Sequence, residues 1–159
     1  MKKNVLILGG SSDIGSELAK IFLDKNNYEV DLHFHSNIKA LKNLRYKCNL
    51  IKSDLSIPNE KKILKKFRTN YDIIINLVGY ISGKSFNDFT IKGLEKTLRI
   101  NSLIPMMIIR RSLKTMIKKK WGRVVNSSSV GVKFGGGDKT FEYSLSKHFN
   151  EFIPSHFKR

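Results

Sequence analysis

The segment VLILGGSSDIGSELAK, residues 5–20, decides the fold of this chain. Its apolar start predicts a buried strand over Asn4–Leu8, and the stretch Ile14–Lys25 predicts an amphipathic helix. The glycines between them allow a tight turn and a close approach of a ligand to the backbone. The amino end of the helix then offers unpaired N–H groups and a positive dipole end to a phosphate. We therefore expect a strand–helix unit that binds a nucleotide; a purely structural turn is the alternative.

Short apolar runs alternate with amphipathic stretches along the rest of the chain, which is typical of an α/β domain built on a parallel sheet. No internal repeat or linker interrupts the pattern, so residues 1–159 are expected to form a single domain. Further strands are expected at Tyr28–His35, around Leu50 and Ile51, at Asp72–Leu77 and at Arg123–Ser127. Further helices are expected at Ile38–Leu44, from Pro58 through Phe67, from Thr90 to Lys120 with a bend at Pro105, and at Phe141–Ile153.

The chain is strongly basic, with 30 Lys and Arg against 13 Asp and Glu and a net charge of +17. A basic face is the usual footprint of nucleic-acid binding. Here the lysines are scattered, and the 23 Lys, 18 Ile and 13 Asn are residues that AT-rich codons specify. The charge therefore predicts no specific nucleic-acid partner, although a basic nucleic-acid-binding protein stays as a less favoured alternative.

Other composition features exclude several classes of protein. The one cysteine, Cys48, cannot form an internal disulfide, and the apolar runs are too short for a signal peptide or a membrane span. We therefore expect a cytoplasmic protein without membrane contact. His33 and His35 project to one face of a strand, but no acidic residue is spaced with them, so no metal site is expected.

The glycine-rich segment LGGSSDIG, residues 8–15, resembles the TGxxxGxG turn of the short-chain dehydrogenase/reductase family. Gly9 and Gly15 match the family motif, whereas Leu8 stands where the family has Thr and Asp13 replaces the middle glycine. A carboxylate in a first helical turn caps N–H groups well but repels a phosphate that lies too close.

Three further segments resemble the same family. Asp54-Leu55, after the third expected strand, is similar to the acidic site that contacts the adenine ring. The run NLVG, residues 76–79, is similar to the family's NNAG segment. Asn101 falls where the family has its catalytic asparagine, and a buried asparagine bonded to the backbone is the structural alternative.

The most specific resemblance is in the last third of the chain. The run GRVVNSSS, residues 122–129, is similar to the family's strand that ends in the catalytic serine, and the register favours Ser129 over Ser127 and Ser128. Tyr143 and Lys147 form a YxxxK motif, and a spacing of four places both on one helix face. The chain is thus identified as a member of the short-chain dehydrogenase/reductase family from Asn4 to about Phe152.

The resemblance implies an NAD(P)-dependent oxidoreductase that interconverts a carbonyl and an alcohol. Transfer of a hydride at carbon must be matched by a proton at oxygen, and an unassisted tyrosine releases its proton only near pH ~10. Lys147 is implied to make Tyr143 a better general acid/base and to hold the nicotinamide ribose. Ser129 is implied to hydrogen-bond the substrate oxygen, and Asn101 to hold a water that relays protons.

The implied catalytic residues are Asn101, Ser129, Tyr143 and Lys147. The implied cofactor-binding residues are Gly9, Ser11, Ser12, Asp13, Ile14, Gly15, Ser36, Asn37, Asp54, Leu55, Asn76, Val78, Gly79, Tyr143 and Lys147. The second strand ends in His35-Ser36-Asn37, with Lys39 nearby and no carboxylate to repel a 2′-phosphate, which favours NADP(H) over NAD(H).

The implied fold is a Rossmann-type doubly wound parallel sheet in a three-layer α/β/α sandwich, with strand order 3-2-1-4-5. The family domain continues into a sixth and a seventh strand, and this chain ends at Arg159 without them. We therefore expect an incomplete sheet and weak turnover; a catalytically inactive nucleotide-binding relative is the alternative. The implied partners are a small carbonyl or alcohol substrate and a second copy of the chain, docked through the long helix and the catalytic helix.

Overall fold

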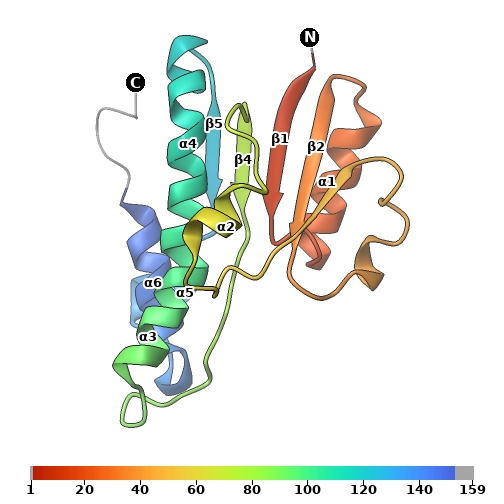
Figure 1. The fold of residues 1–159 in the computed structure, drawn as a ribbon. Helices are drawn as coiled ribbons and strands as arrows, with labels where there is room; N and C mark the ends of the chain where they lie inside the picture. The colour runs from red at the N-terminus through yellow and green to blue at the C-terminus, as the bar shows by residue number, and fades with distance from the viewer. Residues whose placement is uncertain (1, 153–159) are drawn as a thin grey trace.

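The computed structural model describes residues 2–152 and contains one five-stranded parallel sheet with strand order β3-β2-β1-β4-β5 (Figure 1). The strands are β1 (Lys3–Leu8), β2 (Tyr28–Phe34), β3 (Asn49–Lys52), β4 (Ile73–Asn76) and β5 (Arg123–Asn126). The order reverses between β1 and β4, which is where the carboxyl ends of the strands open a crevice in such sheets. The strand order expected from the sequence is confirmed.

Six α-helices are described, together with three shorter helical turns. The helices are α1 (Asp13–Asp24), α2 (Glu60–Leu64), α3 (Ile91–Leu98), α4 (Ile104–Lys118), α5 (Val130–Phe134) and α6 (Phe141–Glu151). The turns are the 3₁₀ segments Lys39–Leu41 and Asp138–Thr140 and the π-helical segment Arg99–Leu103.

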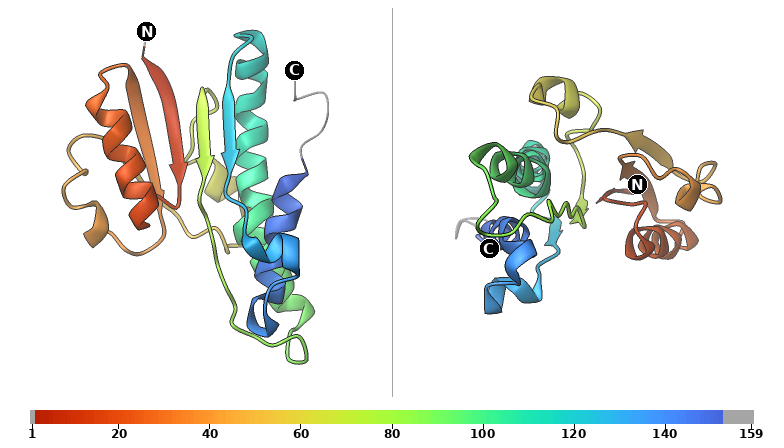
Figure 2. Two further views of the ribbon diagram at one scale, coloured as in Figure 1. Left: turned by 180° about the vertical axis from the view of Figure 1, so that it is seen from behind. Right: turned by 90° about the horizontal axis from the view of Figure 1, so that it is seen from below.

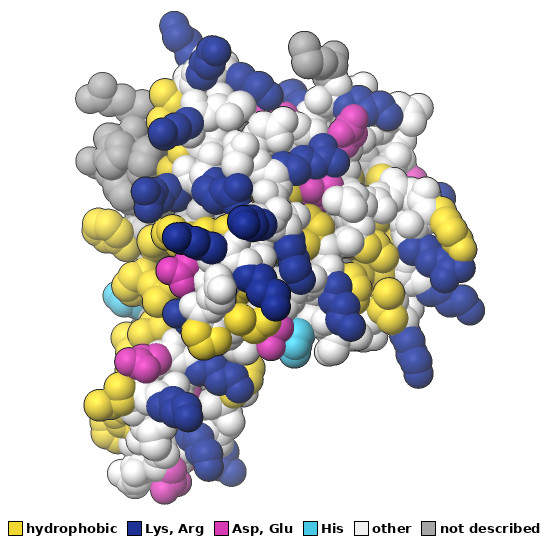
Figure 3. Space-filling model, viewed as in Figure 1, with side chains coloured by type: hydrophobic (Ala, Val, Ile, Leu, Met, Phe, Trp, Pro, Cys, Tyr) yellow, Lys and Arg dark blue, Asp and Glu magenta, His cyan; other side chains and the backbone are white. Residues whose placement is uncertain are grey.

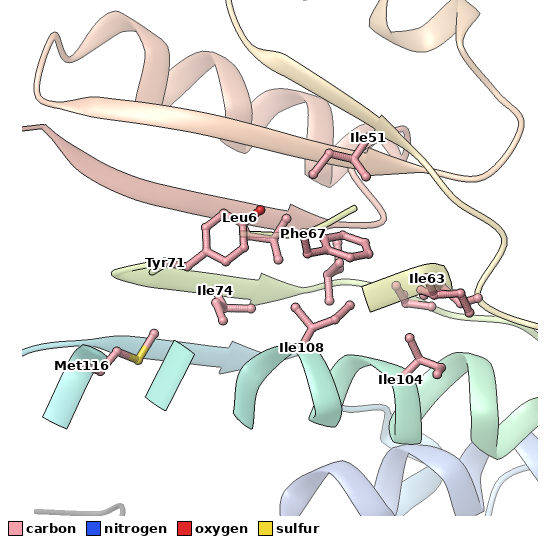
Figure 4. Close-up of a cluster of buried hydrophobic side chains, with 12 residues drawn as sticks. Leu6, Ile51, Ile63, Phe67, Tyr71, Ile74, Ile104, Ile108 and Met116 are labelled. Atoms are coloured by element: carbon pink, nitrogen blue, oxygen red, sulfur yellow. The ribbon is translucent and has the colours of Figure 1, made fainter. Parts of the chain in front are cut away.

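Helices cover both faces of the sheet, so the three-layer α/β/α arrangement is confirmed (Figure 2). Leu6 and Leu8 of β1 point into a core shared with α2 and α4, which Figure 4 shows around Ile74 and Ile108. Val5 and Ile7 point the other way, into a core with α1. Since alternate side chains of β1 enter two cores, this strand is buried on both faces.

The long helix expected from Thr90 to Lys120 is interrupted, but not by Pro105. The interruption is the π turn Arg99–Leu103, where the Ile104 amide donates to the Arg99 carbonyl. Pro105 lies in the first turn of α4, where a missing N–H costs little, so the expected bend at the proline is wrong.

Several other boundaries differ from the expected ones, including the end of α2 at Leu64 instead of Phe67. Only a 3₁₀ turn, Lys39–Leu41, forms within Ile38–Leu44. Helix α2 begins after Asn59, whose side chain accepts from the Lys62 amide and so caps the helix, rather than at Pro58. Helix α6 ends at Glu151; Ile153 lies outside the described residues.

Lys and Arg side chains are spread over the face drawn in Figure 3 and are interspersed with apolar and acidic side chains. None of the helices within residues 2–152 combines the length and the apolar character that a membrane crossing requires.

Candidate active site

The glycine turn joins β1 to α1 with almost no space for side chains. Gly9 has φ +77°, a conformation that favours glycine, and it packs against the backbone of Leu77 and Val78 after β4. A Cβ on Gly15 would lie 2.7 Å from both the Gly10 Cα and the Gly9 carbonyl oxygen. Only glycine therefore allows α1 to start this close to the turn.

Helix α1 begins at the carboxyl edge of the sheet with its cap in place. The Ser12 hydroxyl accepts from the Gly15 amide at 3.1 Å, and the Ser16 amide donates to the Ser12 carbonyl. Among the hydrogen bonds of residues 2–152, the amides of Asp13 and Ile14 have no acceptor, as expected for a helical first turn. These two amides and the helix dipole suit an anion.

The buried His33 of β2 connects the glycine turn to the end of β3. Its Nδ1 accepts from the Gly9 amide at 3.3 Å, so its Nε2 carries the proton and donates to the Ser53 carbonyl at 3.0 Å. Burial lowers the pKa of His33 to about 4, so the ring is neutral at neutral pH. His33 is thus a support for the turn, a role that the sequence analysis missed because it considered this residue only as a metal ligand.

A cleft of about 460 Å³ opens at the carboxyl ends of β2 and β3. Burial would raise the pKa of Asp54, but hydrogen bonds from Ser56 and the positive fields of His35 and Lys96 outweigh burial and hold it below its ordinary value. The lining residues are His35, Ser36, Lys52, Ser53, Asp54 and Lys66. Of the expected cofactor residues, the cleft includes Ser36 and Asp54; Asn37 is exposed outside its lining, and the Leu55 side chain is buried in the core.

The loop after β4 is tied down by two buried asparagines. Asn76 accepts from the Val78 amide and donates to Asn126, and its side chain is fully buried. Asn101, in the π turn, exchanges two hydrogen bonds with the Tyr80 backbone, at 2.7 and 2.9 Å. Both side-chain amides are therefore occupied by structural bonds, and they hold the loop that carries Gly79.

Asn101 is also bound to helix α6. Its Nδ2 donates to the Ser146 hydroxyl at 2.8 Å, and its backbone carbonyl accepts from Asn150 at 2.9 Å. An α-helix would pair this carbonyl with the amide of residue 105, and because Pro105 has no N–H, the carbonyl is free to accept from Asn150. Neither Ser146 nor Asn150 was expected from the sequence, because neither belongs to a motif.

A second cleft, of about 370 Å³, lies where α5 and α6 approach the loop after β4. Ser129 and Tyr143 both line it, and apolar walls come from Ile81, Val130 and Phe134. Ser129 caps α5 by accepting from the Gly131 amide at 3.2 Å, which leaves its own O–H able to donate into the cleft. Of the three consecutive serines, Ser129 is the one that lines this cleft.

Lys147 is buried behind Tyr143, with only 1% of its surface exposed. Its ammonium lies 5.5 Å from the centre of the Tyr143 ring and donates to the Val78 carbonyl at 2.8 Å. It also donates to the carbonyl and hydroxyl oxygens of Ser127, at 3.2 and 2.8 Å. Burial lowers the pKa of Lys147 to about 8. Lys147 of the YxxxK pair therefore binds the segments that directly follow β4 and β5.

The structure thus places Ser36 and Asp54 in one cleft and Ser129 and Tyr143 in the other, and the glycine turn follows β1. Within residues 2–152, no cluster of three or more histidine, cysteine or acidic side chains could hold a metal ion.

Comparisons with known proteins agree on one family. Residues 3–154 match the family model for short chain dehydrogenases. The 3-oxoacyl-[acyl-carrier-protein] reductase of Rickettsia prowazekii is 30% identical over 152 residues, which are 91% of this chain and 61% of that protein. An uncharacterized oxidoreductase of Saccharomyces cerevisiae is 31% identical over 79% of this chain and 42% of its own length. This chain thus spans about two fifths to three fifths of these relatives.

Solved structures show the same fold. A short-chain dehydrogenase from Sphingobium yanoikuyae in complex with NADPH superposes with a TM-score of 0.77 at 23% identity, over 92% of this chain and 61% of the other. An angucycline C-6 ketoreductase with bound NADP has a TM-score of 0.79 at 22% identity, over 99% of this chain and 66% of the other.

Proposed function

Because this chain belongs to the short-chain dehydrogenase family, we propose that it carries the cofactor-binding and catalytic residues of an NAD(P)-dependent oxidoreductase that interconverts a carbonyl and an alcohol. Tyr143 is the general acid/base of the proposed reaction. The observation that carries the proposal is the meeting of Ser129 and Tyr143 in one cleft, with the Lys147 ammonium 5.5 Å from the tyrosine ring.

The residues present fit a dinucleotide. The glycine turn leaves no room for a Cβ at Gly15, and the open amides of Asp13 and Ile14 suit a pyrophosphate. The cleft at β2 and β3 suits the adenosine end, and Gly79, beside Tyr143, leaves space for the nicotinamide end. When bound, the nicotinamide ring would supply or accept the hydride at the carbonyl carbon.

Ser129 and Tyr143 act on the substrate oxygen in this proposal. The Ser129 hydroxyl accepts from the Gly131 amide, so its own O–H is free to donate to the substrate oxygen as negative charge develops there. The Tyr143 hydroxyl donates the proton that completes the alcohol, and takes it back in the reverse direction.

Lys147 supplies the positive charge behind Tyr143. A cation close to a phenol favours the phenolate, so the ammonium makes the Tyr143 proton easier to release. With no ion-pair partner among the described residues, this charge is not neutralised by a carboxylate. Asn101 is hydrogen-bonded both to the loop after β4 and to α6, and the Lys147 ammonium lies between these two elements. We also propose that Asn101 holds a water that relays protons.

We propose NADP(H) as the preferred cofactor. His35, Lys52 and Lys66 line the adenosine-end cleft, and Asp54 is the one carboxylate in its lining. Three groups that carry or can carry positive charge suit a 2′-phosphate. Two of the structural neighbours hold NADPH or NADP, which supports the same preference.

We also propose that two copies of the chain associate through the long helix and α6. Apolar side chains on these helices are partly exposed: Leu103 at 43%, Met106 at 39%, Leu145 at 40% and Phe149 at 43%. Sedimentation should give twice the chain mass, and Phe149→Asp should return it to one chain; a single-chain mass for the unchanged protein would contradict this part of the proposal.

The proposed function is tested with the parent chain and Tyr143→Phe. Reduction of a panel of ketones, aldehydes and 3-oxoacyl thioesters is followed with NADPH and NADH, and cofactor binding is measured by calorimetry. We expect NADP(H) to bind about tenfold more tightly than NAD(H), and Tyr143→Phe to lose turnover about a thousandfold without losing binding. Tighter NAD⁺ than NADP⁺ binding would overturn the preference. Absence of all cofactor binding would overturn the function, and binding without turnover in the parent would indicate an inactive relative.

A further inference from the structure

Three oxygen atoms hold the buried ammonium of Lys147. They are the Val78 carbonyl at 2.8 Å, the Ser127 hydroxyl at 2.8 Å and the Ser127 carbonyl at 3.2 Å. An ammonium has three donors and no acceptor, so each of these bonds matches one N–H, and a bond to the nicotinamide ribose would take the place of one of them, the longest being that to the Ser127 carbonyl. These protein oxygens replace hydration that Lys147 loses on burial.

These bonds matter more than usual because Lys147 has no ion-pair partner among residues 2–152. A buried charge without a counter-charge depends on its hydrogen bonds to remain charged. Burial alone already lowers the pKa of Lys147 to about 8. Loss of any one of the three acceptors would favour the neutral amine further.

Only one of the three acceptors is a side chain. The Val78 carbonyl follows β4, and the Ser127 backbone is fixed by its amide, which donates to the Asn76 carbonyl at 2.9 Å and extends the pairing of β4 with β5. The Ser127 hydroxyl therefore depends on the residue type at this position, whereas the two carbonyls do not.

The three consecutive serines after β5 make separate contacts. Ser128 donates to Glu151, and Ser129 caps α5 and lines the catalytic cleft. Only Ser127 contacts the Lys147 ammonium. Its neighbour Ser128 is therefore a matched control for the loss of a serine hydroxyl from the same loop.

We propose that Ser127 is a positioning residue, whose hydroxyl holds the Lys147 ammonium, in its charged form, at the ends of β4 and β5 beside Tyr143. The inference rests on the proposed function, in which that charge assists Tyr143. It adds a residue that acts through Lys147 and touches neither the substrate nor the reacting atoms.

The test compares Ser127→Thr with Ser127→Val, which have nearly the same shape and differ in the hydroxyl. Each purified chain is labelled with a trace of acetic anhydride near neutral pH, and mass spectrometry gives the labelling of Lys147 relative to the exposed Lys139. Since only the neutral amine reacts, we expect Ser127→Val to raise the ratio about fivefold, with Ser127→Thr and Ser128→Ala at the parent value. Where Ser127→Val melts below the assay temperature, Ser127→Ala replaces it, with the same expected rise.

Equal labelling of Lys147 in folded Ser127→Thr and in the variants without the hydroxyl would overturn the inference. NADPH binding, measured by fluorescence on the same samples, separates it from the proposed function. If no sample binds NADPH while the labelling difference persists, the proposed function fails and the positioning of Lys147 by Ser127 stands.

Discussion

Strands β1 and β5 both end in a loop that leads into a helix of the candidate site, but they are covered very differently. β1 lies between β2 and β4, and its residues Val5–Leu8 are fully buried. β5 pairs with β4 alone among the described strands, and Val125 in its centre is 51% exposed. The proposed cofactor half of the site thus rests on a strand inside two cores, and the proposed catalytic half on a strand at the edge of the described sheet.

This difference separates two kinds of support. The glycine turn is held by packing and by a buried histidine, so changes there should affect the whole fold. The loop after β5 is held by hydrogen bonds to Lys147, Asn76 and Glu151, so changes there should affect the site more than the fold. An edge strand has no neighbouring strand on one side, and the half-exposed Val125 shows that β5 also buries less apolar surface than β1.

The first prediction compares the two strands directly by removing apolar volume from each. Leu6→Ala should lower the free energy of unfolding by about 4 kcal/mol, because Leu6 is fully buried against Ile74 and Ile108 and leaves a cavity. Val125→Ala should cost less than about 1 kcal/mol, because half of the Val125 side chain is already in water. Urea unfolding followed by circular dichroism measures both, and equal losses would remove the contrast between the strands.

The second prediction uses pH to weaken the cofactor half selectively. The pKa of His33 is about 4 in the folded chain, and its ordinary value is 6.5. As the pH falls, His33 therefore takes up its proton at a higher pH in the unfolded chain than in the folded chain. Stability from His33 is therefore complete above pH ~6.5 and is lost as the pH falls towards ~4, by ~3 kcal/mol in total. A protonated Nδ1 would also face the Gly9 amide with a second donor.

The matched variant for this titration is His33→Gln, which keeps polar groups at the site but does not titrate. The difference in unfolding free energy between parent and variant should fall as the pH decreases from ~6.5 to ~4. Other titrating groups are shared by both chains, so their contributions cancel in this difference. A difference that is constant from pH ~4 to ~6.5 would mean that His33 is not the group responsible.

The third prediction adds a side chain at one glycine of each half. Gly15→Val should weaken NADPH binding about a hundredfold, because its Cβ would lie 2.7 Å from the Gly10 Cα and force the turn open. Gly137→Val, beside the catalytic cleft, should bind NADPH as the parent does, since its Cβ has no neighbour closer than 3.9 Å. Fluorescence titration measures the dissociation constant of NADPH for both variants. If Gly15→Val bound NADPH as tightly as the parent does, the proposal that the glycine turn binds the phosphates would be wrong.

The sequence predicted the parallel strands, the glycine turn and the Tyr143–Lys147 pair because these depend on local geometry. Apolar runs separated by helices predict parallel strands, and a glycine turn after the first strand predicts where the helix begins. Tyr143 and Lys147 had to share a helix face because a helix repeats every ~3.6 residues. The boundaries of α2 and α6 were less predictable, since a cap such as Asn59 competes with a nearby proline.

The partners of those residues depended on the tertiary structure. The π turn at Asn101 lies where α3 and the turn itself pack against α6, and no local pattern marks it. The sequence predicted no metal site at His33 and gave it no other role, whereas the pairing of β1, β2 and β3 sets Gly9 and Ser53 on either side of its ring. Ser127 looked like a neighbour of the catalytic serine until α6 brought Lys147 to it.

By itself, then, the sequence predicted the glycine turn and the shared face of Tyr143 and Lys147 from spacing within one or two neighbouring elements, and the strand order from its resemblance to a known family. Only the tertiary structure decided which buried groups satisfy one another. Hydrogen-bond partners such as Lys147 and Val78 lie 69 residues apart, and their contact depends on how β4, β5 and α6 pack together rather than on any local pattern.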